Sequence, residues 1–330
     1  MSGLYIKSIA HYLPSKVLSN RDLEAMVDTT DEWIVTRTGI RERRVSGAGE
    51  EVSDMAAKAG EKALAAAGLS ARDLDAILLA TCTPDMTMPS AASLVQAKLG
   101  APEIMSFDIN AACSGFVYAV EVAEGLLSTG RHRNVLLACS EKFSSMVNYR
   151  DRSTCILFGD GAGALVLSAE PPGARLVAAY CGGKGELAHL LQRPAGGSRV
   201  PFQSHPPEAD IYAQMAGREV FKHAVRGMSH SAEQTLALVG WKNSDVDWLV
   251  PHQANFRLIE SAREKLGLPA DRVVLNIERV GNMSAASIPV AMSEAQGRFK
   301  PGDRLLCLAF GAGLTWGGLA FEWGAVGSAP

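Results

Sequence analysis

The sequence predicts an α/β fold built from two similar halves. The near-continuous apolar run at 75–83 is typical of a central strand that is covered on both faces. The tripeptide Lys-Leu-Gly at 98–100 recurs at 265–267, an offset of 167 residues in a chain of 330. Flanking segments also align at about that offset, which favours two copies of one α/β unit related by a pseudo-twofold axis. We therefore divide the chain into halves at 1–172 and 173–330.

The chain is expected to begin with a strand and two short helices. Residues 4–19 contain an apolar run that ends at Pro14. Ser19 is a good N-cap for a helix that runs to Met26. Thr30 is a good N-cap for the next helix, because acidic residues follow it where the helix dipole favours them.

The rest of the first half alternates between strands and helices. Ser53 is expected to cap an alanine-rich helix that ends at Gly68. The later elements are a strand at 75–83, a helix at 90–100, a strand that turns into a helix at 104–130, a strand at 134–142 and a glycine-rich pair of strands at 155–168. The stretch 170–213 is rich in Gly, Pro and polar residues, and we expect it to be an irregular connection between the halves.

Composition excludes several classes of function. The net charge of −3 and the pI near 6.2 argue against a nucleic-acid-binding protein, because neutralising phosphates needs a basic surplus. The start of the chain lacks a signal-peptide pattern, and no window has 18 consecutive apolar residues. We therefore expect a soluble cytoplasmic protein that does not enter a membrane. The six cysteines lack metal-ligand spacing, which indicates reduced thiols without a metal site.

Cys113 is the candidate nucleophile. It lies where the apolar run at 104–109 turns into an amphipathic helix, and small residues on both sides leave its sulfur accessible. The N-terminus of a helix favours a negative charge, so we expect a thiolate at neutral pH. The alternative is a buried cysteine that only packs.

Two residues of the second half occupy the corresponding places. His252 lies in the loop after a predicted strand, and Asn282 follows Gly281 in the turn that matches the Cys113 turn. A pseudo-twofold axis would bring the ends of these strands together, and Cys113, His252 and Asn282 would then share one site. Taken singly, His252 is compatible with a structural role and Asn282 with turn chemistry. The glycines at 311–313 allow a close approach of the backbone, so that an N–H there and that of Cys113 form an oxyanion hole.

Six motifs together resemble the β-ketoacyl-acyl carrier protein synthase III family, the initiating condensing enzymes of dissociated fatty acid synthesis. They occur in the family's order and span nearly the whole chain: DEWIVTRTGIRERR around Trp33, NAACSGF around Cys113, DRSTCILFGDGAGA at 151–164, PHQAN at 251–255, GNMSAASIP at 281–289 and FGAGLTWG at 310–317. The resemblance implies a thiolase fold, in which two similar halves form a five-layered α/β/α/β/α sandwich. It also implies a homodimer.

The resemblance implies a role for each candidate catalytic residue. Cys113 would accept an acyl group from acyl-CoA, most simply acetyl-CoA, and malonyl-acyl carrier protein would then lose CO2 and attack the acyl group. His252 and Asn282 would donate hydrogen bonds to the enolate oxygen, and the N–H groups of Cys113 and Ala312 would form the oxyanion hole. This chemistry needs no metal or redox cofactor.

The resemblance also implies binding residues. The expected acyl-CoA contacts are Trp33 and Arg152 at the adenine, Arg37 and Thr38 at the phosphates, and Met215 and Gly217 at the pantetheine tunnel. Phe221 is expected beside the catalytic site, and Asn255 is expected to contact the substrate. The expected contacts to the acidic carrier protein are Lys222, Arg257, Arg218 and Arg263. Met88 stands at a loop position that bounds the acyl pocket of the neighbouring subunit. Many members have phenylalanine there, so the preferred length and branching of the primer stay open.

Two other functions fit the same residues. One is a related acyl-transferring or ketide-forming enzyme of secondary metabolism that uses Cys113 with another acceptor. The other is an acyl-binding scaffold without activity, which the presence of all three candidate catalytic residues disfavours.

Overall fold

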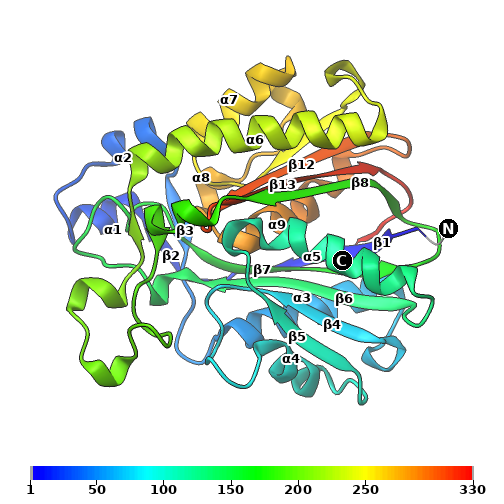
Figure 1. Ribbon diagram of the computed structural model, residues 1–330, viewed down its shortest axis with the longest axis horizontal. Coiled ribbons are helices and arrows are strands. Elements are labelled where there is room, and N and C mark those ends of the chain that lie inside the picture. The colour runs from blue at the N-terminus through cyan, green and yellow to red at the C-terminus, as the bar shows by residue number, and fades with distance from the viewer. Residues whose placement is uncertain (1–2, 329–330) are drawn as a thin grey trace.

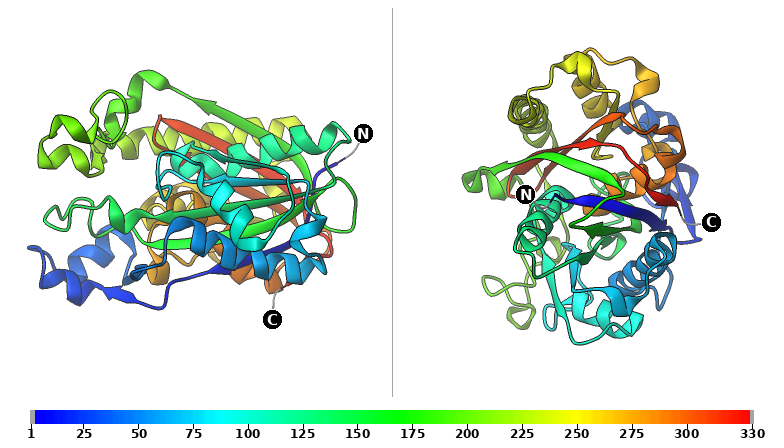
Figure 2. Two further views of the ribbon diagram at one scale, coloured as in Figure 1. Left: turned by 90° about the horizontal axis from the view of Figure 1, so that it is seen from below. Right: turned by 90° about the vertical axis from the view of Figure 1, so that its right-hand side faces the viewer.

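The computed structural model describes residues 3–328 and has ten strands in one continuous sheet that folds into two layers (Figures 1 and 2). The first layer has the order β5 (Met105–Ile109), β4 (Ala76–Ala80), β6 (Asn134–Lys142), β7 (Asp160–Ser168) and β1 (Tyr5–Tyr12). The second has the order β11 (Trp248–Pro251), β12 (Arg304–Gly311), β13 (Thr315–Glu322) and β8 (Ala174–Gly183). The layers join where Tyr5 and Ile6 of β1 pair with β8, and β14 (Gly327–Ser328) pairs with β1.

Helices form three further layers, so the five-layered thiolase fold is confirmed. Helices α3 (Val52–Ala67) and α4 (Ala91–Leu99) cover the outer face of the first sheet layer. Helices α6 (Gly217–Val239) and α7 (Phe256–Leu266) cover the outer face of the second. Helices α5 (Gly115–Ser128) and α9 (Ser287–Ala295) lie between the two layers (Figure 1). Strand β4 is buried along its whole length, as its apolar run predicts.

A smaller region packs against the ends of the strands. It contains β2 (Val17–Ser19), α1 (Asn20–Glu24), α2 (Asp31–Thr38) and β3 (Glu42–Arg44). The predicted N-caps are confirmed, because the side chain of Ser19 accepts from the N–H of Asp22 and that of Thr30 from the N–H of Trp33. Beside this region lie α8 (Ile277–Val280) and the two-residue strands β9 (Leu191–Gln192) and β10 (Gln214–Met215).

Three predictions about local structure were wrong. Glu51 rather than Ser53 caps α3, and the Ser53 hydroxyl instead donates to Asp85 Oδ1 at 2.6 Å. Only β7 forms within 155–168, because the residues before it turn and then make a single bridge to Asn282. The stretch 170–213, expected to be irregular, contains the ten-residue strand β8. Its apolar and polar residues alternate only weakly, so the sequence pattern did not indicate a strand.

The halves repeat each other at the turn that was predicted to carry the chemistry. Ala112 precedes Cys113 with φ +46°, and Ser284 precedes Ala285 with φ +47°. Each begins a 3₁₀ turn that leads into a central helix, α5 in the first half and α9 in the second. The turns touch, because a Cβ added at Gly115 would lie 3.1 Å from the Cβ of Ala285. Within residues 3–328, no helix combines the length and the hydropathy that crossing a bilayer requires.

Candidate active site

The turn that carries Cys113 is a strained one. A positive φ at a residue with a side chain costs about 1–3 kcal/mol, and Ala112 adopts it immediately before Cys113. The backbone of Gly311 lies against the turn, since a Cβ there would fall 2.8 Å from the Cys113 nitrogen. The Thr315 hydroxyl contacts the carbonyl oxygens of Ala111 and Ala312 at 3.2 and 2.9 Å. The predicted close approach at 311–313 is therefore present, and the oxyanion hole stays a prediction.

His252 is held at the end of β11 as a neutral imidazole. Its backbone N–H donates to the Leu308 carbonyl at 2.8 Å, which continues the pairing with β12. Its side chain is 1% exposed, and burial lowers its pKa from 6.5 to about 3. A neutral ring keeps one N–H donor at physiological pH. Among the described residues, Nδ1 of His252 has no hydrogen-bond partner.

Asn282 is oriented by hydrogen bonds at its backbone and side chain. Its N–H donates to the Leu157 carbonyl at 2.8 Å, and its carbonyl accepts from the Gly159 N–H at 2.9 Å. Its Oδ1 accepts from the Ser284 N–H at 2.8 Å. Because the oxygen is occupied, the amide NH2 is the group that Asn282 offers to the site.

Cys113 lies where two cavities meet. A narrow cavity of about 110 Å³ is lined by Cys113, His252 and Asn282 together, so the structure brings the three residues to one place. Met215, Gly217 and Phe221 line the same cavity on the side of α6. A larger cavity of about 770 Å³ also reaches Cys113, and apolar residues such as Phe143, Phe158, Leu191 and Ala213 form much of its wall.

The prediction of a resting thiolate was wrong. Burial raises the pKa of Cys113 to about 12, because a thiolate there would lose most of its hydration. The Ser284 side chain lowers this pKa, and the negative charge of Glu141 raises it further. The thiol therefore carries its proton at neutral pH, and the loss of that proton is part of the reaction. Burial cannot be read from the position of a cysteine before a helix.

Glu141 is a component of the site that the sequence analysis missed. Its carboxyl is completely buried at the end of β6, and burial raises its pKa. It accepts hydrogen bonds from the hydroxyls of Thr83 at 2.6 Å and Thr81 at 3.2 Å and from the N–H of Cys82 at 3.2 Å. These bonds fix the loop that forms one wall of the larger cavity. The sequence feature that could have indicated a role for Glu141 is its position, as a charged residue near the end of a strand that is otherwise mostly apolar.

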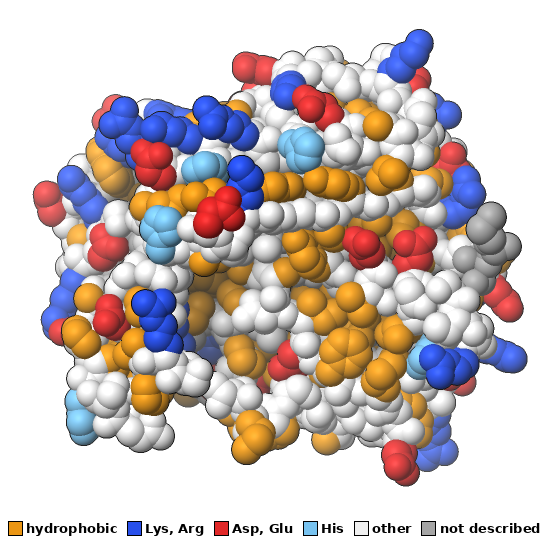
Figure 3. All heavy atoms as spheres, viewed as in Figure 1, with side chains coloured by type: hydrophobic (Ala, Val, Ile, Leu, Met, Phe, Trp, Pro, Cys, Tyr) orange, Lys and Arg blue, Asp and Glu red, His pale blue; other side chains and the backbone are white. Residues whose placement is uncertain are grey.

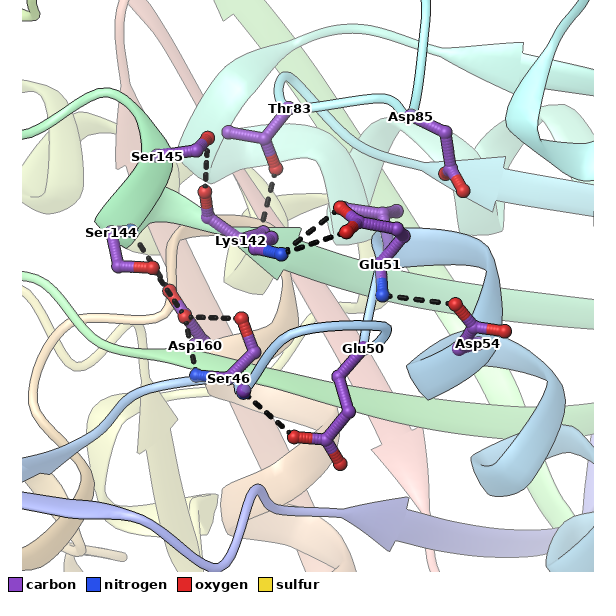
Figure 4. A network of polar contacts seen from close by, with 12 residues as sticks. Ser46, Glu50, Glu51, Asp54, Thr83, Asp85, Lys142, Ser144, Ser145 and Asp160 are labelled. Atoms are coloured by element: carbon purple, nitrogen blue, oxygen red, sulfur yellow. Dashed lines mark hydrogen bonds and ion pairs between the residues drawn. The ribbon is translucent and has the colours of Figure 1, made fainter.

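A polar network holds the same wall from outside (Figure 4). Lys142 forms an ion pair with Glu51 at 3.0 Å, and its backbone N–H donates to Thr83 Oγ1 at 2.9 Å. Asp160 is buried and accepts from the backbone N–H groups of Ser46 at 2.8 Å and Ser144 at 2.9 Å. The ends of β6 and β7 and the wall of the larger cavity thus form one connected unit.

Two arginines lie beside Trp33 of α2, and the contact of these residues with a nucleotide stays a prediction. The guanidinium of Arg37 lies 4.4 Å from the centre of the Trp33 ring, and that of Arg152 lies 4.9 Å from it. Thr38 does not belong to this surface. It is 2% exposed, and its hydroxyl donates to the Ile34 carbonyl and accepts from the Ile40 N–H. The prediction that Thr38 contacts phosphates is corrected, because its hydroxyl is bonded to backbone groups at the C-terminal end of α2.

Asn255 also has a structural role. It is the N-cap of α7, where its Oδ1 accepts from the Arg257 N–H at 2.9 Å, and its NH2 donates to the Arg37 carbonyl at 3.0 Å. It therefore ties α7 to α2. Asn255 lines the narrow cavity, but both polar ends of its side chain are already used, and its contact with acyl-CoA stays a prediction.

The basic residues predicted to meet a carrier protein divide into two groups. Arg218, Lys222 and Arg257 are exposed, and Figure 3 shows basic side chains gathered where α6 begins, near α2. Lys222 is paired with Glu219 at 3.0 Å, and Arg257 also donates to the Thr36 carbonyl. The prediction that Arg263 contacts the carrier protein is corrected. Its half-buried guanidinium donates to Glu260 at 2.9 Å and to the Leu268 carbonyl at 2.8 Å. In residues 3–328, no group of three or more His, Cys, Asp or Glu side chains is arranged to hold a metal ion.

The burial of His252 predicts a pH dependence of stability. The unfolded imidazole binds a proton below about pH 6.5, whereas the folded one stays neutral down to about pH 3. The unfolded state therefore gains protons between these values, and the free energy of unfolding falls with falling pH by up to about 1.4 kcal/mol per unit. Denaturant titrations between pH 8 and pH 4.5 should show a shallower decline for His252→Gln. Equal slopes would contradict the buried neutral imidazole.

Comparisons with known proteins agree with this geometry. Family models described as 3-Oxoacyl-[acyl-carrier-protein (ACP)] synthase III match residues 107–185 and, for its C-terminal part, residues 236–323. The chain is similar to a β-ketoacyl-[acyl-carrier-protein] synthase III from Roseiflexus castenholzii, with 48% identity over 95% of this chain and 96% of that protein. The corresponding enzyme from Caldanaerobacter subterraneus is 47% identical over 94% and 95%.

A solved structure extends the likeness to three dimensions. The crystal structure of 3-oxoacyl-[acyl-carrier-protein] synthase III from Aquifex aeolicus has a TM-score of 0.90 and 44% identity, covering 97% of this chain and all of that one. The duplicated fold, the convergent Cys, His and Asn side chains and the near-complete coverage lead to one assignment. The chain belongs to the β-ketoacyl-acyl carrier protein synthase III family of condensing acyltransferases.

Proposed function

We propose that this chain condenses an acyl group from acyl-CoA with malonyl-acyl carrier protein through an acyl intermediate on Cys113, and that this step initiates fatty acid biosynthesis. The observation that carries the proposal is the single cavity lined by Cys113, His252 and Asn282. The residues come from different halves of the duplicated fold. The reaction needs no metal or redox cofactor, because it uses only a thiol nucleophile and hydrogen-bond donors.

The first step transfers the acyl group. The Cys113 sulfur attacks the thioester carbonyl, a new C–S bond forms, and the bond to the CoA sulfur breaks. Burial disfavours both the Cys113 thiolate and the His252 imidazolium, so the proton leaves the thiol as the C–S bond forms. The neutral imidazole of His252 passes that proton to the departing CoA sulfur. The backbone N–H groups of Cys113 and Ala312 stabilise the oxyanion.

The second step makes the carbon nucleophile. Malonyl-acyl carrier protein loses CO2, and negative charge develops on its thioester oxygen. The NH2 group of Asn282 and the N–H of neutral His252 stabilise that charge. The carbanion attacks the acyl carbonyl, a C–C bond forms, and the C–S bond to Cys113 breaks. The departing sulfur takes up a proton from water, which restores the thiol, and 3-oxoacyl-acyl carrier protein is released.

The proposed partners meet the enzyme at the narrow cavity. Its lining by Met215, Gly217 and Phe221 suits a pantetheine arm, and Trp33 with Arg37 and Arg152 offers an aromatic and cationic surface for the rest of CoA. Exposed Arg218, Lys222 and Arg257 give an acidic carrier protein a basic surface on an enzyme of net charge −3.

We propose that the enzyme is a cytoplasmic homodimer. The six cysteines are all free, which suits a reducing compartment. Met88 is 84% exposed on the loop beside the larger cavity, and its neighbour Met86 is 46% exposed. Apolar side chains so exposed suit a contact with a second copy, where Met88 would bound the partner's acyl cavity. Light scattering coupled to gel filtration measures the mass directly.

Product analysis tests the function. Purified enzyme is incubated with acetyl-CoA and either malonyl-acyl carrier protein or malonyl-CoA, and the products are identified by mass spectrometry. We expect 3-oxobutanoyl-acyl carrier protein, CO2 and CoA from the first mixture. Turnover only with free CoA thioesters or small acceptors would favour a ketide-forming enzyme. The absence of any acyl mass on Cys113 would favour a non-catalytic scaffold.

The larger cavity predicts which substitution narrows the choice of primer. Its volume of about 770 Å³ lies within the range of about 300–1,000 Å³ typical of small-molecule sites, so space alone does not restrict the primer to acetyl. Ala213→Leu adds apolar bulk to the wall. We expect kcat/KM for a medium-chain acyl-CoA to fall at least about 10-fold relative to acetyl-CoA. Ala213→Ser, which adds little volume, is the control. If Ala213→Leu leaves the ratio of the two kcat/KM values unchanged, the acyl chain of the primer does not lie in the larger cavity.

A further inference from the structure

Arg43 is a buried cation to which the proposed chemistry assigns no role. It lies in β3, its side chain is completely buried, and in residues 3–328 no carboxylate lies within ion-pair distance of it. Removing a guanidinium from water costs several kcal/mol unless hydrogen bonds compensate. The hydrogen-bond partners of Arg43 therefore indicate which parts of the fold the buried guanidinium holds in place.

The guanidinium binds three neutral acceptors from two segments that are far apart in the sequence. It donates to the Leu18 carbonyl at 3.1 Å, to Asn20 Oδ1 at 2.9 and 3.0 Å, and to the Ile156 carbonyl at 2.7 Å. The hydrogen bond to the Ile156 carbonyl is the shortest of these bonds, and it joins residues that lie 113 positions apart in the sequence. It anchors the segment 156–159, which belongs to no regular strand.

That segment is the one on which Asn282 is held. The carbonyl of Leu157 accepts from the Asn282 N–H, and the N–H of Gly159 donates to the Asn282 carbonyl. Phe158 and Asn282 thus form a parallel bridge. A displacement of 156–159 would therefore move Asn282 with it.

The side chain of Arg43 also contacts the turn before Asn282. A Cβ at Gly281, where φ is +70°, would lie 2.9 Å from the Cβ of Arg43, and one at Gly159 would lie 3.2 Å from it. The preceding helix α8 is tied to the residue just before β3, because the Arg41 N–H donates to the Glu278 carbonyl at 2.9 Å. Arg43 thus lies between the two backbone segments that define the place of Asn282.

We infer that Arg43 is a positioning residue for Asn282: its guanidinium fixes the segment 156–159 and thereby the direction in which the Asn282 amide faces the cavity. The inference rests on the proposed function of Asn282 as a hydrogen-bond donor in decarboxylation. Arg43 does not touch the reacting atoms, so its loss should affect the step that uses Asn282 and spare the transfer of the acyl group to Cys113.

The test compares the two half-reactions in Arg43→Met, which keeps an unbranched apolar side chain and removes the guanidinium. We expect decarboxylation of malonyl-acyl carrier protein to fall by about 10- to 100-fold, the loss expected from a misplacement of about 1 Å. The rate at which acetyl-CoA labels Cys113 should change less than about threefold. Arg43→Lys, which keeps the charge and loses the planar fork, should give an intermediate loss if the methionine variant does not fold.

A double-mutant cycle separates positioning from general destabilisation. In an Asn282→Ala background, Arg43→Met should reduce decarboxylation by no more than about twofold, because the group that it positions is gone. Ser8→Ala is the matched control, since it removes another buried hydrogen bond, 2.6 Å long to the Ala63 carbonyl, from a site away from Asn282. It should leave both half-reactions unchanged.

The outcomes distinguish the inference from the function on which it rests. Equal losses in both half-reactions, a full additional loss in the Asn282→Ala background, or unchanged decarboxylation in folded Arg43 variants would overturn the positioning role. A wild-type enzyme that does not decarboxylate malonyl-acyl carrier protein, or an Asn282→Ala variant as active as wild type, would instead overturn the proposed function.

Discussion

Replacing Cys113 by alanine is expected to abolish acyl transfer and condensation while malonyl decarboxylation continues. The substitution removes one sulfur atom and keeps the Cβ, so the 3₁₀ turn after Ala112 and the start of α5 should persist. His252 and Asn282 still line the cavity and still face a malonyl thioester. We expect condensation to fall by on the order of 10⁴-fold or more. The other thiol on the larger cavity, Cys82, donates to Glu141 at 3.4 Å, and burial raises its pKa, so it is a poor replacement for the Cys113 sulfur.

Intact-protein mass spectrometry measures this result directly. After incubation with acetyl-CoA, wild type should gain one acetyl mass, and Cys113→Ala should gain none. Cys307→Ala is the control, because Cys307 is a completely buried core thiol on β12 and should leave labelling at the wild-type level. An acetyl mass on the Cys113→Ala protein, or condensation by it, would transfer the nucleophilic role to another residue.

The convergence of the three candidate residues could be predicted from the sequence because it follows from the duplication. A repeat of about half the chain requires corresponding segments to meet. Cys113 follows the end of β5, His252 follows the end of β11, and Asn282 lies in the turn before α9 that matches the Cys113 turn. The structure shows that Ala112 and Ser284 share a positive φ at matching turns. The strands β4 and β6 were also predictable, because their apolar runs require burial on both faces.

What the sequence could not supply was the environment of each group. A cysteine before a helix predicts a thiolate, but burial reverses the direction of the pKa shift. Thr38, Asn255 and Arg263 have the right chemistry for ligands, yet neighbouring backbone groups occupy their side chains. Such bonds depend on where the helix ends fall, which periodicity does not determine to within a residue.

Buried charges were missed for a related reason. Glu141 and Arg43 look like surface residues in the sequence, since each lies beside other polar or charged residues. Their importance comes from what they contact across the fold, Thr83 and Cys82 for Glu141 and Ile156 for Arg43. Those contacts join segments about 60 and more than 100 residues apart in the sequence, and no local pattern indicates them.

Replacing Asn282 by alanine is expected to reduce decarboxylation and condensation by about 10²–10³-fold, the loss typical when one donor to a developing oxyanion is removed. Acetyl transfer to Cys113 should stay within a few-fold of wild type, because that step places its charge on a different oxygen. Release of labelled CO2 from malonyl-acyl carrier protein measures the first effect, and acetyl labelling of Cys113 measures the second. Equal losses in both would indicate a damaged fold rather than a lost donor.

Asn282→Asp makes the sharper test, because it preserves shape and reverses the chemistry. One carboxylate oxygen can still accept from the Ser284 N–H, but the other replaces the NH2 donor with an acceptor that repels the enolate. At neutral pH this variant should be at least as defective as Asn282→Ala. Its site is 6% exposed, so burial should raise the pKa of the new carboxyl, and at lower pH the protonated acid again has a hydrogen to donate. Decarboxylation by Asn282→Asp should therefore recover relative to Asn282→Ala as the pH falls, whereas a flat ratio would mean that donation by residue 282 is not what the reaction uses.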